Sequence, residues 1–129
     1  MQRRDRAGDW LAQAQDDLRC AESNLRGGFF AQCCFICQQA AEKAVKSIAF
    51  HRGAKAAHSH SLVKLCEELA LNGALREAAG ILDQYYVSAR YPDALPGGAP
   101  FQVFSKSQAE DSVQRAGLFV TAAHAEVGP

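Results

Sequence analysis

The chain has 129 residues, 48% of them hydrophobic, and its 14 Lys and Arg are balanced by 14 Asp and Glu to a formal net charge of zero. This length and composition suit one folded domain over residues 1–129, with a core of about residues 8–127, and argue against disorder throughout. Zero net charge excludes a uniformly basic clamp for nucleic acid, although it leaves room for a local basic patch.

Two amphipathic helices are predicted in the first half of the chain, over about residues 5–26 and 29–52. In the first, apolar residues recur at three- and four-residue steps, and Gly27-Gly28 ends it because glycine readily takes the left-handed conformation. The second has small residues along its middle, which allow a neighbouring helix to approach closely.

A third and a fourth helix are predicted in the next forty residues or so. The third begins at Ser59 or Ser61, either of which suits an N-cap, and ends before an Asn-Gly pair. The fourth covers about residues 74–89, with Gly80 as a weak point. It ends before Pro92, because the residue that precedes a proline avoids helical geometry.

An irregular loop over residues 92–104 precedes the last helix. Three apolar residues are expected to pin part of this loop to the core, namely Phe101, Val103 and Phe104. The last helix opens at Ser105 or Ser107, each of which has a capping-box partner three residues later, and ends near residue 126. No segment alternates like a strand, so we predict an all-α fold, an up-and-down antiparallel helical bundle of about five helices.

Neither a membrane span nor a signal peptide is expected. No apolar run approaches the roughly 18–20 residues that cross a bilayer, and no apolar segment follows the polar residues 1–9. The chain has five cysteines, and this odd number without a secretory signal fits reduced thiols in a cytoplasmic protein. Cys34 and Cys37 form a C-x-x-C pattern, but it lies within a helical apolar pattern, so we expect core packing rather than a metal site.

Three short motifs follow one another along the predicted helices. They are, in chain order, Gln39-Ala40-Ala41-Glu42-Lys43-Ala44-Val45-Lys46, His60-Ser61-Leu62-x-x-Leu65 and Arg90-Tyr91-Pro92-Asp93. Together with the preceding helix, which carries Trp10 and Asp17-Leu18, their order and separations resemble those of a HEPN domain over about residues 8–127.

The resemblance to HEPN domains implies an up-and-down bundle that usually dimerises and is linked to nucleotide or RNA binding. Many members are encoded beside a minimal nucleotidyltransferase as a toxin–antitoxin pair, so a nucleotidyltransferase is an expected protein partner. The resemblance implies no cofactor and no metal ion.

A large subset of HEPN domains are metal-independent ribonucleases, marked by an Arg that is followed, after four to six intervening residues, by a His near the end of a late helix. After Arg90 the corresponding positions 95–97 hold no His. Arg52 and His58 match the spacing, but they fall after the second helix, and we interpret that match as a coincidence. Acid–base cleavage would lack its usual proton carrier, so a ribonuclease is disfavoured.

A polar face of the second helix is a candidate phosphate site. Gln39, Lys43 and Lys46 share this face at three- and four-residue spacing, and Glu42 lies beside it. Lysine ammonium groups bind phosphate as point charges, and Arg90 would add a bidentate fork if it packed against this helix. The alternative is a solvated face on which Glu42 and Lys46 form an exposed ion pair.

His58 and His60 precede the third helix, where backbone N–H groups attract anions and a neutral His can donate a hydrogen bond to a phosphate or base. A metal site is not expected, because no carboxylate or Cys lies nearby in sequence to complete a ligand set. The alternative role for these histidines is capping or core contact.

The segment Arg90-Tyr91-Pro92-Asp93 has two interpretations. In the structural one, Asp93 holds Arg90 in a salt bridge at the helix C-terminus, where the helix dipole favours positive charge. In the functional one, Arg90 contacts a phosphate while Tyr91 stacks on a base.

Three functions follow from these residues and the resemblance. The first is a dimeric HEPN-like module that binds nucleotide or RNA or docks a nucleotidyltransferase. Its candidate binding residues are Gln39, Lys43, Lys46, His60, Arg90, Tyr91 and Asp93. The second is a metal-independent ribonuclease in which Arg90 acts with His60 or His58, and the third is a dimerising partner without a ligand.

Overall fold

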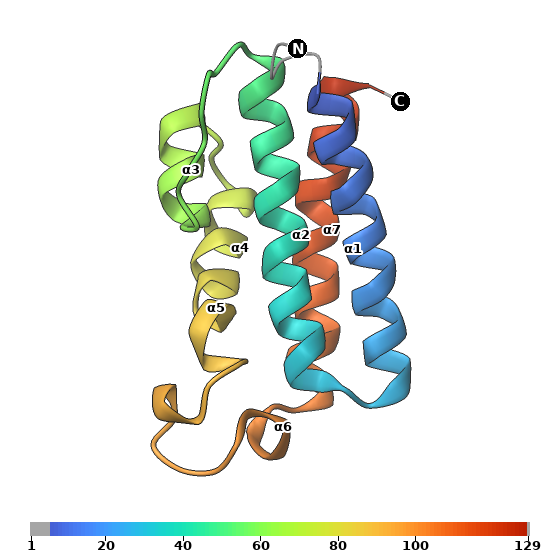
Figure 1. Cartoon of the computed structure of the whole chain (residues 1–129), viewed down its shortest axis with the longest axis vertical. Coiled ribbons are helices and arrows are strands. Elements are labelled where there is room, and N and C mark those ends of the chain that lie inside the picture. Colours follow the sequence, from blue (N-terminus) through green and yellow to red (C-terminus); the bar gives the residue numbers. More distant parts are fainter. Residues whose placement is uncertain (1–5, 129) are drawn as a thin grey trace.

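The computed structural model describes residues 6–128, and this part of the chain is helical with no strand. Three long helices lie side by side in Figure 1: α1 (Ala7–Gly27), α2 (Phe30–His51) and α7 (Lys106–Val127). A fourth column beside α2 consists of three shorter helices, α3 (Leu62–Leu69), α4 (Ala74–Asp83) and α5 (Tyr85–Ser88). In this column α3 packs antiparallel to α4, because Leu62 at the start of α3 bonds to Asp83 at the end of α4. The direction of the chain alternates through α1, α2, the pair α4 and α5, and α7, which confirms the all-α, up-and-down antiparallel bundle. The helix α3 departs from this order, because it runs back toward the end of α2, where the Leu69 carbonyl meets Arg52.

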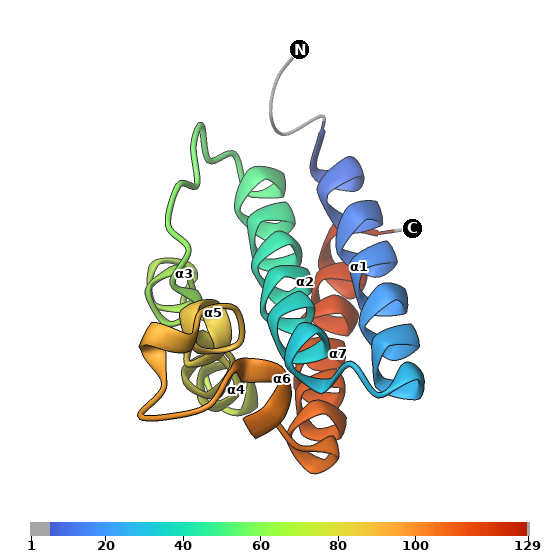
Figure 2. The ribbon, with the colours of Figure 1, turned by 60° about the horizontal axis from the view of Figure 1, so that its bottom comes forward.

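Two short elements close one end of the bundle. The 3₁₀ helix η2 (Pro92–Ala94) and the helix α6 (Pro100–Val103) lie within the segment expected to be an irregular loop. Figure 2 shows this segment passing from α5 beneath the bundle to the start of α7. Within residues 6–128, no helix is both long and apolar enough to span a bilayer.

The helix ends agree with the expected capping residues. Gly28 takes a φ of 81° at the end of α1, in the left-handed region that glycine enters without strain. Ser61 caps α3 by accepting a hydrogen bond from the backbone N–H of Lys64. Ser105 and Gln108 form the capping box of α7.

The helix α2 is the centre of the bundle, because it contacts α1 and α7 as well as the three helices of the fourth column. Most of its 22 residues are buried, including those on the side that faces α3 and α5. The small residues along its middle, such as Ala40, Ala41 and Ala44, have no exposed surface. They let backbones approach closely, which places the polar side chains of α2 within reach of neighbouring elements.

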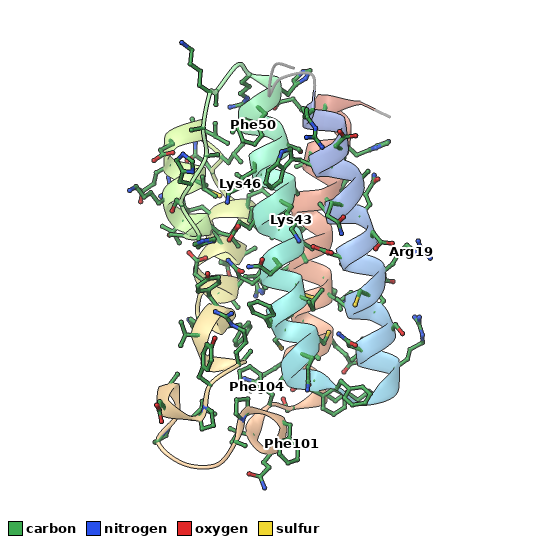
Figure 3. All side chains as sticks on the ribbon, in the orientation of Figure 1. Arg19, Lys43, Lys46, Phe50, Phe101 and Phe104 are labelled. Atoms are coloured by element: carbon green, nitrogen blue, oxygen red, sulfur yellow. The ribbon has the colours of Figure 1, made fainter. Side chains whose placement is uncertain are left out.

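Two expectations about the second half of the chain are wrong in detail. The fourth helix is interrupted at Gln84 rather than at Gly80, because the Gln84 N–H bonds to the Ile81 carbonyl in a tight i to i−3 turn. Of the three apolar residues expected to pin the loop, Phe101 is 72% exposed and Val103 is 50% exposed. Figure 3 shows Phe101 on the outer side of α6, and only Phe104 packs inward, edge-on against Tyr85.

Arg52 joins three helix ends. Its Nε and Nη2 atoms donate to the two carboxylate oxygens of Glu126 at 2.7 and 2.8 Å, and its Nη1 donates to the Leu69 carbonyl at 2.7 Å. These contacts connect the ends of α2, α3 and α7. All three nitrogens of the guanidinium are therefore engaged within the fold, which agrees with a structural role for Arg52.

We expect Glu126→Gln to lower the free energy of unfolding at pH 7 by up to about 1 kcal/mol, because this bidentate pair is partly exposed. Hydrogen bonds from Arg52 hold the pKa of Glu126 below its ordinary value. The carboxylate thus adds stability above about pH 4.3, and this is lost as pH falls through the lower pKa of the folded state.

Urea unfolding at pH 7 and well below pH 4 measures this prediction. The difference between wild type and variant should be present at pH 7 and vanish in acid. Glu110→Gln, on an exposed site of the same helix, is the control and should change little at either pH. An equal loss at both pH values would contradict the assignment.

Candidate functional site

Three polar side chains form a buried line along α2. Gln38, Glu42 and Lys46 are spaced four residues apart, so they lie on one face of the helix, and each is at most 5% exposed. We call these three residues the polar stripe. Buried polar groups are stable only when they are paired, so the partners of the stripe decide what this face can do.

The carboxylate of Glu42 bridges Lys46 and His60. The Lys46 ammonium donates to Glu42 Oε2 at 3.0 Å, and His60 Nδ1 lies 3.1 Å from Oε1 and 3.3 Å from Oε2. A carboxylate that pairs with an ammonium only accepts hydrogen bonds, so its contact with His60 calls for an N–H donor on the ring. His60 Nδ1 therefore carries a proton that it donates to Glu42, and neutral His60 keeps Nε2 as an acceptor.

His60 is held at two further points. The Gln38 side-chain amide donates to the His60 carbonyl at 3.1 Å, and Gln39 in turn donates to the Gln38 amide oxygen at 2.7 Å. The imidazole stacks on the Tyr86 ring with centroids 5.1 Å apart and planes 19° from parallel. The His60 side chain is nevertheless 57% exposed, so this is a surface residue with a fixed orientation.

Arg90 lies against the same tyrosine. Its Nε donates to the Tyr86 carbonyl at 2.8 Å, and its guanidinium carbon lies 4.4 Å from the ring centroid of Phe35, 4.7 Å from that of Tyr86 and 5.0 Å from that of Tyr91. We call these four residues the Arg90 cluster. Within the described residues, the two Nη groups of Arg90 form no hydrogen bond or ion pair, so they remain available to an anion.

The structure thus brings together three of the residues singled out in the sequence. Lys46, His60 and Arg90 lie along one chain of contacts that passes through Glu42 and Tyr86. The expected alternative of an exposed Glu42–Lys46 pair is wrong, because their side chains are 5% and 7% exposed. Neighbouring helices cover this face, which the helical pattern by itself does not reveal.

The other candidate residues lie apart from this chain of contacts or at its edge. Lys43 turns toward α1, where it forms an ion pair with Asp17, as Figure 3 shows for its position between the two helices. Tyr91 is half exposed beside Arg90. Within the described residues Asp93 forms no ion pair with Arg90, so the expected salt bridge is wrong. The stacking of Arg90 on three rings takes its place.

The N-terminus of α3 already holds an anionic group. The carboxylate of Asp83 accepts hydrogen bonds from the backbone N–H groups of Leu62 at 2.8 Å and Val63 at 3.0 Å, and from the Ser61 hydroxyl at 3.2 Å. The N–H groups that we considered for phosphate are therefore occupied by a side chain of the fold itself. His58, by contrast, is exposed and makes no hydrogen bond within residues 6–128.

Sequence reasoning missed four contributors, Gln38, Tyr86, Phe35 and Asp83. Gln38 stands one helical turn before Glu42, which is a visible signal, but its partner is a backbone carbonyl of a distant segment. The aromatic residues give no sign in sequence that they face an arginine rather than the core. Asp83 caps a helix that lies 21 residues earlier in the chain.

Two hollows border the Arg90 cluster. A small one of about 250 Å³ is lined by His60, Ser61, Asp83 and Tyr86. A larger groove of about 450 Å³ is lined by Cys20, Asn24, Gln32, Phe35, Ile36, Ala89 and Arg90. Because Tyr86 and Arg90 are in contact, the two hollows adjoin across this pair.

Four of the five cysteines are packing residues in this fold. Cys33, Cys34, Cys37 and Cys66 have no exposed surface, whereas Cys20 is exposed. Burial raises the pKa of Cys34 and of Cys66 to about 11. Within residues 6–128, no three His, Cys, Asp or Glu side chains form a group suited to a metal ion.

At pH 8, we expect a thiol reagent such as dithionitrobenzoate to modify only Cys20 rapidly in the native protein, because thiolates are the reactive form and the other thiols are buried. All five cysteines should react in denaturant. Cys20→Ser should abolish the rapid phase, and a rapid phase that persisted in this variant would contradict the burial of the other four.

Comparisons with known proteins agree on one family. A sequence profile described as "HEPN domain" matches residues 7–126. The fold is similar to the crystal structure of TT1696 from Thermus thermophilus, with 37% identity, a TM-score of 0.88 and coverage of 98% of this chain and 99% of that one. A comparison with curated proteins finds no match.

Two further solved structures are similar. The archaeal HEPN homologue ST0689 is 30% identical, with a TM-score of 0.81 and coverage of 94% of this chain and 97% of that one. The HEPN domain protein tm0613 from Thermotoga maritima is 33% identical, with a TM-score of 0.72 and coverage of 91% and 95%. In all three comparisons the likeness extends over nearly the full length of both chains.

Proposed function

The chain belongs to the HEPN domain family, a nucleotide- and RNA-related module, and on this premise we propose that it binds a nucleotide or an RNA strand at the Arg90 cluster and His60. The observation that carries the proposal is that Arg90 and His60, which lie 30 positions apart in the sequence, contact the same Tyr86 ring. The phosphate, the base and the sugar of a nucleotide are bound by different kinds of protein group. This surface offers a cation, exposed aromatic area and an imidazole that can form a hydrogen bond.

The phosphate contact is assigned to Arg90 rather than to the lysines. The Lys46 ammonium is buried against Glu42, and that of Lys43 is paired with Asp17, so each already has an anionic partner. The Nη groups of Arg90 have none within the described residues. Stacking on three rings holds the guanidinium in place, which reduces the conformational entropy lost when it binds a phosphate.

The aromatic surface supports the base contact. Tyr91 is half exposed beside the guanidinium, and aromatic rings bind unpaired bases by stacking. A base on Tyr91 and its phosphate on Arg90 would use neighbouring groups of one short segment. The ligand is therefore a free nucleotide or a single strand, because bases within a duplex are not accessible to such a ring.

We expect Arg90→Ala to weaken the binding of a fluorescent single-stranded RNA oligonucleotide about tenfold or more, the loss typical of a charge-assisted hydrogen bond. Arg19→Ala is the matched control, because Arg19 is an exposed arginine that points away from the bundle on α1, as Figure 3 shows. Fluorescence anisotropy measures both affinities, and circular dichroism verifies that each variant is folded. Equal affinities of the wild type and Arg90→Ala would refute the proposed site.

A homodimer is the proposed assembly. A small domain buries a limited fraction of its surface, and this one leaves several large apolar side chains at least 44% exposed. Apart from Tyr91, which belongs to the proposed ligand site, they are Phe29, Val87, Phe101, Val103 and Leu118. Burial of such side chains between two copies supports a symmetric dimer.

Size-exclusion chromatography with light scattering tests the dimer. We expect a mass of about twice 13.9 kDa that persists on tenfold dilution from micromolar concentration. A mass equal to that of one chain at the highest concentration tested would contradict it.

The nucleotidyltransferase partner and the toxin–antitoxin role stay predictions that rest on the family resemblance. The ribonuclease alternative is less well supported than binding. Positions 95–97 hold no His. Arg52, which has a His at the ribonuclease spacing, donates its guanidinium hydrogen bonds to Glu126 and to the Leu69 carbonyl within the fold. His60 is the imidazole that lies near Arg90, and it is oriented by groups outside the ribonuclease signature.

A further inference from the structure

The buried polar stripe converges on one exposed residue. Gln38 binds the His60 backbone, Glu42 binds the His60 ring, and Lys46 holds Glu42. Burying an ion pair gives little net stability, because desolvation offsets most of the attraction between the charges. Apolar side chains at these positions would satisfy the core, so stability does not explain why the stripe is polar.

Anchoring of the loop before α3 does not explain the stripe either. The hydrogen bond from Gln38 to the His60 carbonyl already attaches the backbone of this loop to α2, and Asp83 fixes the start of α3. The contact between Glu42 and the imidazole adds something different. It determines how the ring is turned and which of its nitrogens carries the proton.

The proton assignment follows from the charges. Lys46 balances the charge of Glu42, so the contact with His60 needs only an N–H donor at Nδ1 and no charged imidazole. The Nδ1 edge faces a buried carboxylate while more than half of the side chain is exposed, so Nε2 belongs to the exposed edge. Glu42 therefore holds His60 as a hydrogen-bond acceptor toward solvent.

Few other polar groups of the adjoining hollow are available to a ligand. The Ser61 hydroxyl donates to Asp83 and accepts from the Lys64 N–H, and the Asp83 carboxylate accepts from the start of α3. Neither the Tyr86 hydroxyl nor Nε2 of His60 has a hydrogen-bond partner within residues 6–128. The acceptor Nε2 of His60 lies on the same tyrosine as Arg90, to which we assign the phosphate. This arrangement suits a ligand in which a hydrogen-bond donor stands next to a phosphate.

Building on the proposed function, we propose that His60 selects ribonucleotides over deoxyribonucleotides by accepting a hydrogen bond at Nε2 from the ribose 2′-hydroxyl, and that Glu42 is its positioning residue. The 2′-hydroxyl is a donor that lies between base and phosphate, and it is the group by which a protein distinguishes RNA from DNA. The Tyr86 ring centroid lies 5.1 Å from that of the His60 ring and 4.7 Å from the guanidinium carbon of Arg90, so both groups are within reach of one nucleotide.

Matched oligonucleotides test the proposal directly. The probes are a single-stranded RNA octamer and the DNA octamer of the same sequence with deoxyuridine in place of uridine, so that only the 2′-hydroxyls differ. Anisotropy titrations are run at pH 7.5 in chelator, which removes metal ions. We expect the wild type to bind RNA about tenfold more tightly than DNA, the effect of one hydrogen bond to a group that is otherwise left unpaired.

Two variants separate His60 from Glu42. His60→Phe keeps an aromatic ring on Tyr86 but removes the acceptor, and it should lower RNA affinity to the level of DNA while DNA affinity stays the same. Glu42→Met combined with Lys46→Met leaves no buried unpaired charge and removes the acceptor to which Nδ1 donates. Nitrogen-15 NMR should then show the proton on Nε2 in place of Nδ1, and the preference for RNA should be lost.

A matched control addresses general disturbance of the fold. Asp111 and Arg115 form an i, i+4 ion pair on α7 at 2.7 Å, and Asp111→Asn with Arg115→Met should leave both the RNA preference and the His60 signal unchanged. Retention of the RNA preference in His60→Phe, or a wild type whose His60 carries its proton on Nε2, would overturn the inference.

The outcomes also distinguish failure of the inference from failure of the proposed function. If Arg90→Ala loses affinity but the wild type binds RNA and DNA equally, the binding site stands and the role of His60 is wrong. If neither octamer binds to the wild type, the proposed function fails and the role of His60 fails with it.

Discussion

The burial of α2 is the constraint on which the rest of the structure depends. This helix contacts every other column of the bundle, so a polar side chain on it reaches solvent only with difficulty. Each buried polar group must find a partner in a neighbouring element, because an unpaired one costs about 1–3 kcal/mol. Beyond α2 itself, Gln38 and Glu42 both find their partners in His60, and this positions the surface at which we place ligand binding.

The distribution of positive charge follows the same logic. Lys43 and Lys46 are each paired with a carboxylate inside the monomer, so the lysines of α2 hold the fold together. The start of α3 is likewise neutralised by Asp83. Arg90 differs because its neighbours are aromatic rings, which attract a guanidinium without neutralising it. Among the described residues Arg90 thus has aromatic neighbours and no carboxylate partner, even though the protein has no net charge.

Membership of the HEPN family and the details of this site are separate findings. The family explains the bundle and its link to nucleotides and RNA, yet the Arg–His spacing of its ribonucleases is missing after Arg90. A histidine from the segment before α3 contacts the same Tyr86 ring from a different part of the chain. The orientation of His60 depends on α2, so the site belongs to the packing of three elements rather than to one linear motif.

Much of this protein can be determined from the sequence alone. Periodicity predicts the helices, and Gly28, Ser61 and Ser105 mark their ends, because such signals act within a few residues along the chain. The short motifs identify the family and single out Lys46, His60 and Arg90.

Only the tertiary structure decides which charges remain available to a ligand. Helices from distant parts of the chain decide whether Lys46 meets Glu42 in solvent or in the core. They also decide whether Arg90 contacts Asp93 or three aromatic rings. Local patterns contain no information about that burial, and burial sets the strength of every polar contact.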